Sequence, residues 1–441
     1  MKLSTAVLVA SALCAPVLAA PMSESEVQDL ERAVAADYDA RLEAAFKDFH
    51  AMPELSFRES RTAERMADEL EALGYEVTRG IGRTGVVAVL ENGQGPTVLI
   101  RADMDGLPLL EETGLPYASR HTQRMMDGTD QPVMHACGHD VHITSLLGTA
   151  KQMQDRHADW SGTLVLIVQP AEETGLGAKA MIADGLYTDF PKPDYAIAFH
   201  VASELEAGRI VVPAAAAFSS DDVIDLTVFG VGTHGASPHL GIDPVVLSAA
   251  IVMNLQTIVS RRIGPRRPAV VTVGSIHGGT KHNIIGENVK MELTVRSDDF
   301  ETRKTLLDSI ERIVRNTALA YDVPENRLPT LTYLDESSGP GVNDAETAAY
   351  LAQVISARLP ERFMTEPVRE GMGAEDFASL VEPQHGVEGV YMFVGGTPAE
   401  ELDTAAGHHS PLFKVEPEAS IRAGTEVMTL SAMALFGKDK R

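Results

Sequence analysis

The chain has 441 residues, of which 44% are hydrophobic and 23% charged, a composition typical of a folded globular protein long enough for two domains. Its 63 acidic and 37 basic residues give a formal net charge of -26 at pH 7. This negative charge argues against nucleic acid or an anionic membrane surface as a partner, and it leaves the catalytic chemistry open.

Residues 1–20 have the pattern of a secretory signal peptide. Lys2 gives a short positive region, the stretch from Thr5 to Leu13 is apolar, and Val17-Leu18-Ala19 provides the small residues of a cleavage site. The apolar stretch is too short to cross a membrane, and we expect no membrane span further along the chain. We therefore expect export to the periplasm or the medium, with cleavage of this segment.

Export would leave the mature chain with a single cysteine. The cleaved segment contains Cys14, so Cys137 would be the one remaining thiol. A lone thiol cannot form an internal disulfide and is open to oxidation in such a compartment, whereas binding to a metal shields it. This favours a metal-binding role for Cys137.

Hydrophobic periodicity in the first half of the chain alternates between helix and strand. It predicts helices between Ser23 and about Glu71 and again after residue 142, and strands over 75–78, 85–90, 97–101, 163–169 and 194–199. The apolar run at 163–169 is typical of a strand buried on both faces. The alternation predicts an α/β fold with a mixed, mostly parallel sheet, in which ligands bind beyond the carboxyl ends of the strands.

The pattern changes after about Pro213. The predicted elements there are a strand over 222–229, a helix starting at Asp243-Pro244, strands over 270–276 and 289–295, a helix through Leu306 and Val314, and a strand over 330–334. The order βαββαβ is that of a ferredoxin-like module. The α/β pattern then resumes, with a buried strand over 390–394. We therefore predict a catalytic domain formed by 21–214 and 336–441, and an inserted lid domain over 215–335.

One short segment concentrates groups that bind transition metals. Met134-His135-Ala136-Cys137-Gly138-His139-Asp140-Val141-His142 holds three histidines, a cysteine and an aspartate. Cys137 and His139 are two residues apart where a loop meets a helix, so both side chains can reach one ion. The alternative is a helix start that is merely rich in histidine.

Three further residues complete a candidate ligand set. Glu173 and His200 each follow a predicted core strand, and His409 lies in Gly407-His408-His409-Ser410-Pro411. Five ligands exceed what one zinc ion needs, and a thiolate can bridge, so we predict two divalent ions per subunit, about 3.5–4 Å apart. Zinc suits cysteine and histidine, and manganese, cobalt and nickel are alternatives. Taken alone, His200 could equally be a core histidine.

Neighbouring acidic residues indicate how such a site would act. Glu172 and Glu173 are adjacent at a strand end and point different ways, so one can bind metal while the other accepts a proton from water as a general base. An acidic loop in an acidic protein is the alternative. Asp103 and Asp105 could orient the ligands or cap a turn.

Candidate substrate-contacting residues lie in the predicted lid domain. His234 is not assigned as a metal ligand; we expect it to donate to the substrate oxyanion when the domains close. Asn283 and Arg296 are candidates for holding a substrate carboxylate, Arg296 through its planar fork. The other interpretation of Arg296 is an ordinary exposed position on an alternating strand.

Over roughly residues 30 to 435, the chain resembles the M20 metallopeptidase family. It is most similar to the amidohydrolase branch, which includes auxin-conjugate, hippurate and N-acyl-amino-acid hydrolases. The matching segments are Pro53-Glu54-Leu55-Ser56-Phe57, Arg101-Ala102-Asp103-Met104-Asp105-Gly106-Leu107-Pro108, Met134-His135-Ala136-Cys137-Gly138-His139-Asp140, Gln169-Pro170-Ala171-Glu172-Glu173, His234 with Ala236-Ser237-Pro238, Gly278-Gly279-Thr280 with Asn283, Glu375-Asp376-Phe377 and His409-Ser410-Pro411.

Two substitutions point to that branch. Other M20 branches have a metal-binding histidine where this chain has Arg101, and an aspartate where it has Cys137. The resemblance implies a two-metal site formed by five residues, with Glu172 as the general base; the five are Cys137, His139, Glu173, His200 and His409. It also implies a homodimer that forms through the inserted domain, with His234 acting across the dimer. Asn283-Ile284-Ile285-Gly286 departs from the family's usual Asn-Val-Ile-Pro.

The expected activity is hydrolysis of the amide bond of small N-acyl amino acids or peptides by metal-activated water. One alternative is a dipeptidase or carboxypeptidase that uses the same groups on a substrate with a free amino group. The other is a catalytically silent metal- or ligand-binding protein. The presence of Glu172 beside a full ligand set argues against the silent protein.

Overall fold

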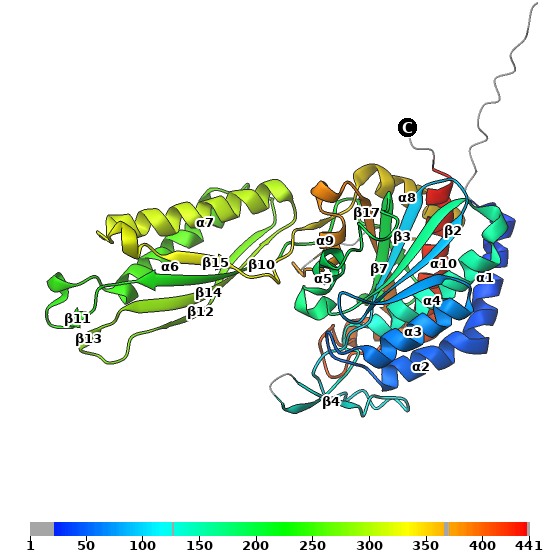
Figure 1. Cartoon of the computed structure of the whole chain (residues 1–441), viewed down its shortest axis with the longest axis horizontal. Helices are drawn as coiled ribbons and strands as arrows, with labels where there is room; N and C mark the ends of the chain where they lie inside the picture. The colour runs from blue at the N-terminus through cyan, green and yellow to red at the C-terminus, as the bar shows by residue number, and fades with distance from the viewer. Residues whose placement is uncertain (1–21, 126–127, 366–368, 370, 439–441) are drawn as a thin grey trace, which may run out of the picture.

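The computed structural model of the chain describes residues 22–125, 128–365, 369 and 371–438. The expected signal peptide over 1–20, with Cys14, lies outside the described residues. Figure 1 shows two bodies side by side: a larger one built around a central sheet, and a smaller one that carries α6 and α7. Both chain segments that join them run through the region next to β10.

The larger body contains a seven-stranded sheet. Its strand order is β1 (Glu76–Ile81), β2 (Gly85–Asn92), β6 (Gly162–Gln169), β3 (Thr97–Asp103), β7 (Tyr195–Glu206), β17 (Glu388–Thr397) and β8 (Ile210–Val211). The four central strands, from β6 to β17, are parallel, and the pairings toward either edge are antiparallel. This confirms the mixed, mostly parallel sheet expected from the sequence. It also places the carboxyl ends of the four central strands along one edge.

Helices cover both faces of this sheet. One face is covered by α1 (Glu24–Asp37), a π-helical turn (Tyr38–Leu42), α2 (Glu43–Ala51), α3 (Ser60–Ala72), α4 (His139–Asp155), α8 (Ala345–Arg358) and α10 (Pro417–Phe436). The other face carries the shorter α5 (Gly177–Ala183) and α9 (Phe377–Leu380). Along β6, Leu164 and Leu166 enter the first core while Val165 and Ile167 enter the second, which explains its continuous apolar sequence.

The smaller body, the lid, is an antiparallel sheet covered by two helices. Its elements are β10 (Asp222–Phe229), α6 (Pro244–Arg261), β12 (Ala269–Gly278), β14 (Asn288–Ser297), α7 (Phe300–Ala320) and β15 (Thr330–Tyr333). The strand order β12-β14-β10-β15 is that of the ferredoxin-like module expected from the sequence. Alternate residues of β14 enter the lid core, namely Val289, Met291, Leu293 and Val295.

Helix α6 begins at an aspartate cap and packs on the lid sheet. Asp243 Oδ1 accepts hydrogen bonds from the amides of Val245 (2.9 Å) and Val246 (3.4 Å). In the part of the chain that the structure describes, α6 alone is long and apolar enough to cross a membrane by length and composition. Its packing is that of a core helix, because one face is buried on the sheet through Leu247, Ile251, Leu255 and Ile258.

The chain passes between the two bodies through two paired segments. β9 (Ala216–Phe218) pairs with β16 (Gly341–Val342), and Asp221 pairs with Ser338 immediately beyond them. A separate hairpin, β4 (Thr122–Arg124) with β5 (Asp130–Pro132), projects from the larger body in Figure 1. The crossing at β9 and β16 therefore lies where residues of both bodies can line one cavity.

Candidate metal centre and active site

The candidate ligands gather at the carboxyl end of the parallel strands. Asp103 ends β3 and pairs in register with Gln169, the last residue of β6. β3 and β7 pair as far as Ile100 and Ile197, three residues before Asp103 and His200. His200 lies within β7 rather than after it, because β7 continues to Glu206 instead of ending at residue 199 as expected.

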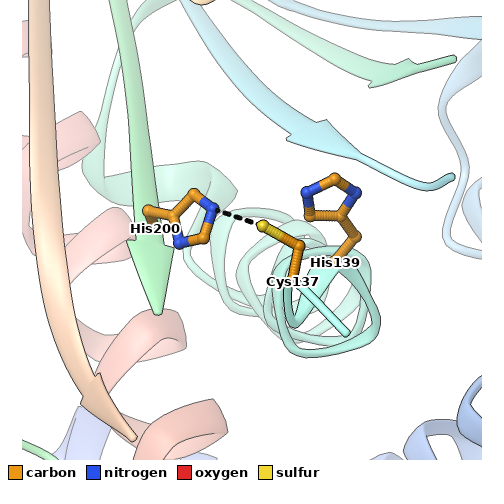
Figure 2. A group of neighbouring side chains, drawn as sticks. All are labelled: Cys137, His139 and His200. Atoms are coloured by element: carbon orange, nitrogen blue, oxygen red, sulfur yellow. Dashed lines mark hydrogen bonds between the residues drawn. The ribbon is translucent and has the colours of Figure 1, made fainter. Parts of the chain in front are cut away.

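Cys137, His139 and His200 form a first group of candidate ligands (Figure 2). One ligand atom from each lies within 4.8 Å of the others, and Cys137 Sγ is 3.4 Å from His200 Nε2. All three residues are buried. Gly138 makes this possible: its φ of +86° turns the chain so that α4 begins at His139.

Cys137 also belongs to a second group, with Glu173 and His409. Their ligand atoms again lie within 4.8 Å of one another, and His409 Nε2 is 3.3 Å from Glu173 Oε2. The amide of His409 donates to the carbonyl of Ala136 (2.8 Å), which ties the C-terminal segment to the Cys137 loop. The structure thus brings all five predicted ligands together, with the Cys137 sulfur common to both groups.

Two turns that carry this site have a left-handed backbone. Ala171, next to Glu172, has a φ of +52°, and His409 has a φ of +62°. For residues with a side chain this conformation costs on the order of 1–3 kcal/mol, and it persists where the surroundings enforce it, most often at functional sites. The backbone strain therefore coincides with the candidate ligands and base.

The electrostatics of the two groups fit bound cations. His139 Nε2 and Glu173 Oε1 are buried with no hydrogen-bond partner among the described residues. Hydrogen bonds to Cys137 and Glu173 raise the pKa of His409 to about 10; burial opposes protonation of His139, but Asp103 raises its pKa. The surroundings of His139 and His409 therefore stabilise positive charge, whereas burial lowers the pKa of His200 and keeps its ring neutral, the form that binds metal. Its sulfur, nitrogen and oxygen donors suit divalent transition metals, and a Cys137 thiolate could bridge two of them.

Glu172 lies beside these ligands and faces the same cavity. Its Oε2 is 3.8 Å from His139 Nε2, and its side chain is 12% exposed. Burial, together with the nearby carboxyls of Glu375 and Glu173, raises the pKa of Glu172 well above its ordinary value. A carboxylate in this environment readily accepts and keeps a proton.

A buried arginine neutralises the carboxyls behind Glu172. Arg101 Nη2 is 2.6 Å from Glu375 Oε1, and Arg101 Nη1 is 2.6 Å from Asp103 Oδ2. Burial alone would raise the pKa of Asp103, but this guanidinium holds it well below its usual range. Spacing in the sequence does not reveal this network, because Arg101 and Glu375 are far apart along the chain.

The other polar residues of the 134–142 segment bond to neighbouring residues or are buried in the interior. His142 Nδ1 is 2.6 Å from Asp103 Oδ1, and His142 Nε2 accepts from the amide of Val201 (2.9 Å), so both ring nitrogens are engaged. Asp140 Oδ2 is 2.7 Å from the Nδ1 atom of His50. His135 is buried, and burial lowers its pKa to about 4.

The substrate-contacting residues predicted in the lid lie at two different places. Arg296 lines the cavity at the metal groups, where it pairs with Asp221 (3.0 Å). His234 and Asn283 lie instead beside the pair of short strands β11 (Thr233–His234) and β13 (Ile284–Ile285), at the end of the lid farthest from the central sheet (Figure 1). Within one chain, the structure therefore brings Arg296 to the candidate ligands but not His234 or Asn283.

The cavity in front of the ligands has a volume of about 720 Å³. Phe218 and Phe393 form an aromatic wall, with ring centroids 5.4 Å apart, and the Phe218 ring is 6.2 Å from that of His200. Glu204 and Glu336 are exposed carboxylates on the same lining. The cavity can therefore accommodate a small organic molecule with both an apolar and a charged part.

Paired sulfur, nitrogen and carboxylate donors at the strand ends, a carboxylate base beside them and an inserted lid define a metal-dependent hydrolase. The sequence model of peptidase family M20/M25/M40 matches residues 99–434, and the chain belongs to this family.

Three comparisons show how similar the chain is to known proteins. The chain is 36% identical to a hippurate hydrolase of Campylobacter jejuni, over 78% of this chain and 86% of that protein. It is 33% identical to thermostable carboxypeptidase 1 of Saccharolobus solfataricus, over 88% of this chain and 94% of that protein. It is also similar to the crystal structure of a dinuclear metal-binding M20 peptidase from Bacillus subtilis, with a TM-score of 0.74, 27% identity, and coverage of 91% of this chain and 99% of that one.

The Gly138 turn generates a test of the ligand geometry. A Cβ at position 138 would lie 2.3 Å from Val201 Cγ1, so Gly138→Ala should displace Cys137 and His139 and remove bound metal. Gly93→Ala is the matched control, because Gly93 has a similar φ of +80° with nothing within 4 Å of its Cβ position. Both variants should lose about 1–2 kcal/mol of stability from the left-handed backbone alone.

Metal content after dialysis and thermal unfolding measure the two effects separately. We expect Gly93→Ala to keep the metal content of the wild type while Gly138→Ala loses it. Equal metal content in the two variants would show that the Cys137-Gly138-His139 geometry is not needed for metal binding.

Proposed function

We propose that this protein is a metal-dependent amidohydrolase that cleaves the amide bond of N-acyl amino acids. The observation that supports this most directly is the Cys137 sulfur shared by two ligand groups, with Glu172 beside them. The five ligands would hold two divalent ions, with zinc favoured by the sulfur and nitrogen donors, and manganese, cobalt or nickel as alternatives. The hippurate hydrolase relative is consistent with this substrate class.

The roles of the chain's own residues follow from their positions. Bound ions would polarise the substrate carbonyl and lower the pKa of water. Glu172 accepts the proton of the attacking water and later returns it to the leaving nitrogen, a transfer that its raised pKa favours. Arg296 at the cavity wall binds the substrate carboxylate, exchanging its present partner Asp221 for the substrate.

The aromatic wall supports bulky, flat acyl groups. If Arg296 holds the carboxylate end of the substrate, the apolar surface of Phe218 and Phe393 next to His200 is left for the acyl end. Aromatic groups pack edge-to-face on such rings, so a benzoyl or indole-bearing acyl group would gain more from this wall than an acetyl group.

A second candidate function rests on the acidic side of the same cavity. Glu204 and Glu336 offer exposed carboxylates that could bind the free ammonium of a dipeptide or longer peptide. This would make the protein a dipeptidase or carboxypeptidase, in line with the carboxypeptidase relative. A substrate panel that contains N-benzoyl, N-acetyl and free dipeptides distinguishes the two functions directly.

We also propose a homodimer that forms through the lid. Exposed apolar side chains gather on the lid, with 53% exposure for Val246, 69% for Met253 and 52% for Ile276. Val246 and Met253 lie on the face of α6 opposite its buried face, and β12, which carries Ile276, is an edge strand of the lid sheet. A second copy would cover this surface, and it would allow the distant His234 to reach the partner's cavity as an oxyanion donor.

We propose export of the mature protein on the pattern of residues 1–20. In an oxidising compartment, bound metal would shield the Cys137 thiol, which lines the cavity. Recovery of a mature chain beginning near Pro21 from the periplasm or medium would support export. An intact N-terminus in the cytoplasm would exclude it.

The first test of the proposed function concerns the base. Glu172→Gln should keep the wild-type metal content while kcat falls by about 10²–10⁴-fold, because the amide cannot take up the proton of the attacking water. Glu173→Gln is the matched control, since it should lose metal from the group that contains His409. Retention of wild-type turnover by Glu172→Gln would refute its role as the base.

The second test concerns substrate choice. Phe218→Ala should lower the ratio of kcat/KM for N-benzoylglycine to that for N-acetylglycine by about tenfold, because it removes half of the aromatic wall. Phe300→Ala is the control, since Phe300 is a half-exposed aromatic residue outside this cavity. Faster hydrolysis of free dipeptides than of either N-acyl substrate would favour the second candidate function instead.

The third test concerns the dimer. Glu172→Gln and His234→Ala should each be inactive as pure proteins, yet their co-expression should restore about a quarter of wild-type activity, because half of the dimers are mixed and each has one intact site. Adding Val246→Glu and Met253→Glu to both chains should give monomers and abolish this recovery. Activity no higher than that of the separate variants would place His234 outside the partner's site.

A further inference from the structure

Two buried carboxyl groups hold the turn that carries Glu172 and Glu173. Ala171 lies in the left-handed region, and its amide donates to Glu59 Oε1 (2.9 Å). The next two amides, those of Glu172 and Glu173, donate to the two carboxyl oxygens of Asp105 (3.1 Å each). Three successive backbone amides therefore donate hydrogen bonds to two carboxyl groups.

Glu59 is itself fixed by its surroundings. It is fully buried, and its Oε1 also accepts from the amide of Phe57 (2.8 Å), another residue with a left-handed backbone (φ +60°). Its Oε2 accepts from Thr84 Oγ1 (2.5 Å). Glu59 thus connects the Pro53-Glu54-Leu55-Ser56-Phe57 segment, to which the proposed function gives no role, with the turn at Ala171.

This arrangement is costly for the fold. Burial and the nearby Asp105 raise the pKa of Glu59 to about 7, and the left-handed Ala171 adds backbone strain. Apolar side chains could fill the same interior space at lower cost. The turn, however, brings the carboxyl groups of two neighbouring residues to the same cavity: Glu173 lies with Cys137 and His409, and an oxygen of each glutamate lies within 4.8 Å of a ring nitrogen of His139. Both carboxyl groups therefore depend on the course of the backbone at this turn.

We propose that Glu59 is a positioning residue: by binding the amide of Ala171, it fixes the left-handed turn that brings the carboxyl groups of Glu172 and Glu173 to the cavity. Glu59 is absent from the lining of the cavity, so it acts through the backbone rather than on the substrate. The inference rests on the proposed function for the roles of Glu172 and Glu173. The hydrogen bond itself is present in the chain whatever the substrate.

The test uses two substitutions at Glu59. Glu59→Ala removes the acceptor for the amide of Ala171. Glu59→Gln keeps an oxygen for the amides of Phe57 and Ala171, and its NH₂ group can bond to Thr84 Oγ1, so it should rescue the wild-type behaviour. Glu59→Asp, which keeps the charge on a shorter side chain, should show the effects of Glu59→Ala at smaller amplitude, and it replaces Glu59→Ala if that variant does not fold.

The matched control is Glu54→Ala. Glu54 is a buried glutamate in the same segment, and its oxygens accept from the amides of Arg61 (3.2 Å) and Thr62 (2.8 Å) at the start of α3. The Glu54→Ala variant therefore loses two comparable hydrogen bonds and leaves the turn at Ala171 unchanged.

The first readout is hydrogen exchange in the full-length protein after removal of metal by a chelator. Amides within 171–175 should exchange about tenfold faster in Glu59→Ala than in the wild type, because the amide of Ala171 is left without its acceptor. Glu54→Ala should speed exchange only at the start of α3. Equal exchange at 171–175 in wild type and Glu59→Ala would overturn the proposal.

The second readout is stepwise metal titration with zinc or cobalt, followed by kinetics at saturating metal. Glu59→Ala should weaken one of the two binding steps, that of the ion held by Glu173 and His409, by about 10–100-fold and lower kcat by a similar factor, with KM nearly unchanged. Equal weakening of both steps, or the same pattern in Glu54→Ala, would indicate a general structural effect and overturn the proposal.

The two hypotheses can fail separately. If the wild type binds fewer than two ions and hydrolyses none of the panel substrates, the proposed function is wrong, while the exchange measurement still decides whether Glu59 holds the turn. If the wild type is active and Glu59→Gln behaves like Glu59→Ala in both readouts, the acceptor role assigned to Glu59 is wrong.

Discussion

The site depends on the neutralisation of buried negative charge at the carboxyl end of the central sheet. The carboxyl groups of Asp103 and Glu375 are buried, and the half-buried carboxyl group of Glu173 lies beside the Cys137 thiol. Such groups lose hydration and repel one another in a low-dielectric environment, so they require positive charge close by. Arg101 provides it from within the sheet, and divalent ions on the cavity side would complete the balance.

The two bodies contribute different residues to the candidate site. The sheet and its adjoining turns present the ligands and the carboxylate base on a rigid framework, which is where accurate geometry is easiest to maintain. The lid contributes Arg296 at the near end, while His234 and Asn283 lie at the far end (Figure 1). In this arrangement one chain brings only the near end of its lid to its own cavity.

Much of this organisation could be predicted from the sequence, because strand ends and ligand types are local signals. The mixed sheet and the ferredoxin-like lid followed from periodicity, and Glu173 and His200 from their places near strand ends. The choice of His409 over its neighbour His408 followed from the resemblance to the M20 family. The extension of β7 beyond His200 could not be foreseen, since the residues there read neither clearly as strand nor as loop. Contacts between distant residues were also hidden, such as the aromatic wall of Phe218 and Phe393 and the bond from Ala171 to Glu59.

The position of the lid within the chain affects how far the C-terminal segment must search for its place in the larger body. Four of the five candidate ligands precede the insertion, and His409 follows it. The first and last strands of the lid, β10 and β15, pair with each other, so a folded lid brings its two ends together. Closing that long loop first makes the docking of the C-terminal segment an effectively local event. A folded lid would therefore bring His409, together with β17 and α10, close to the four candidate ligands that precede the insertion.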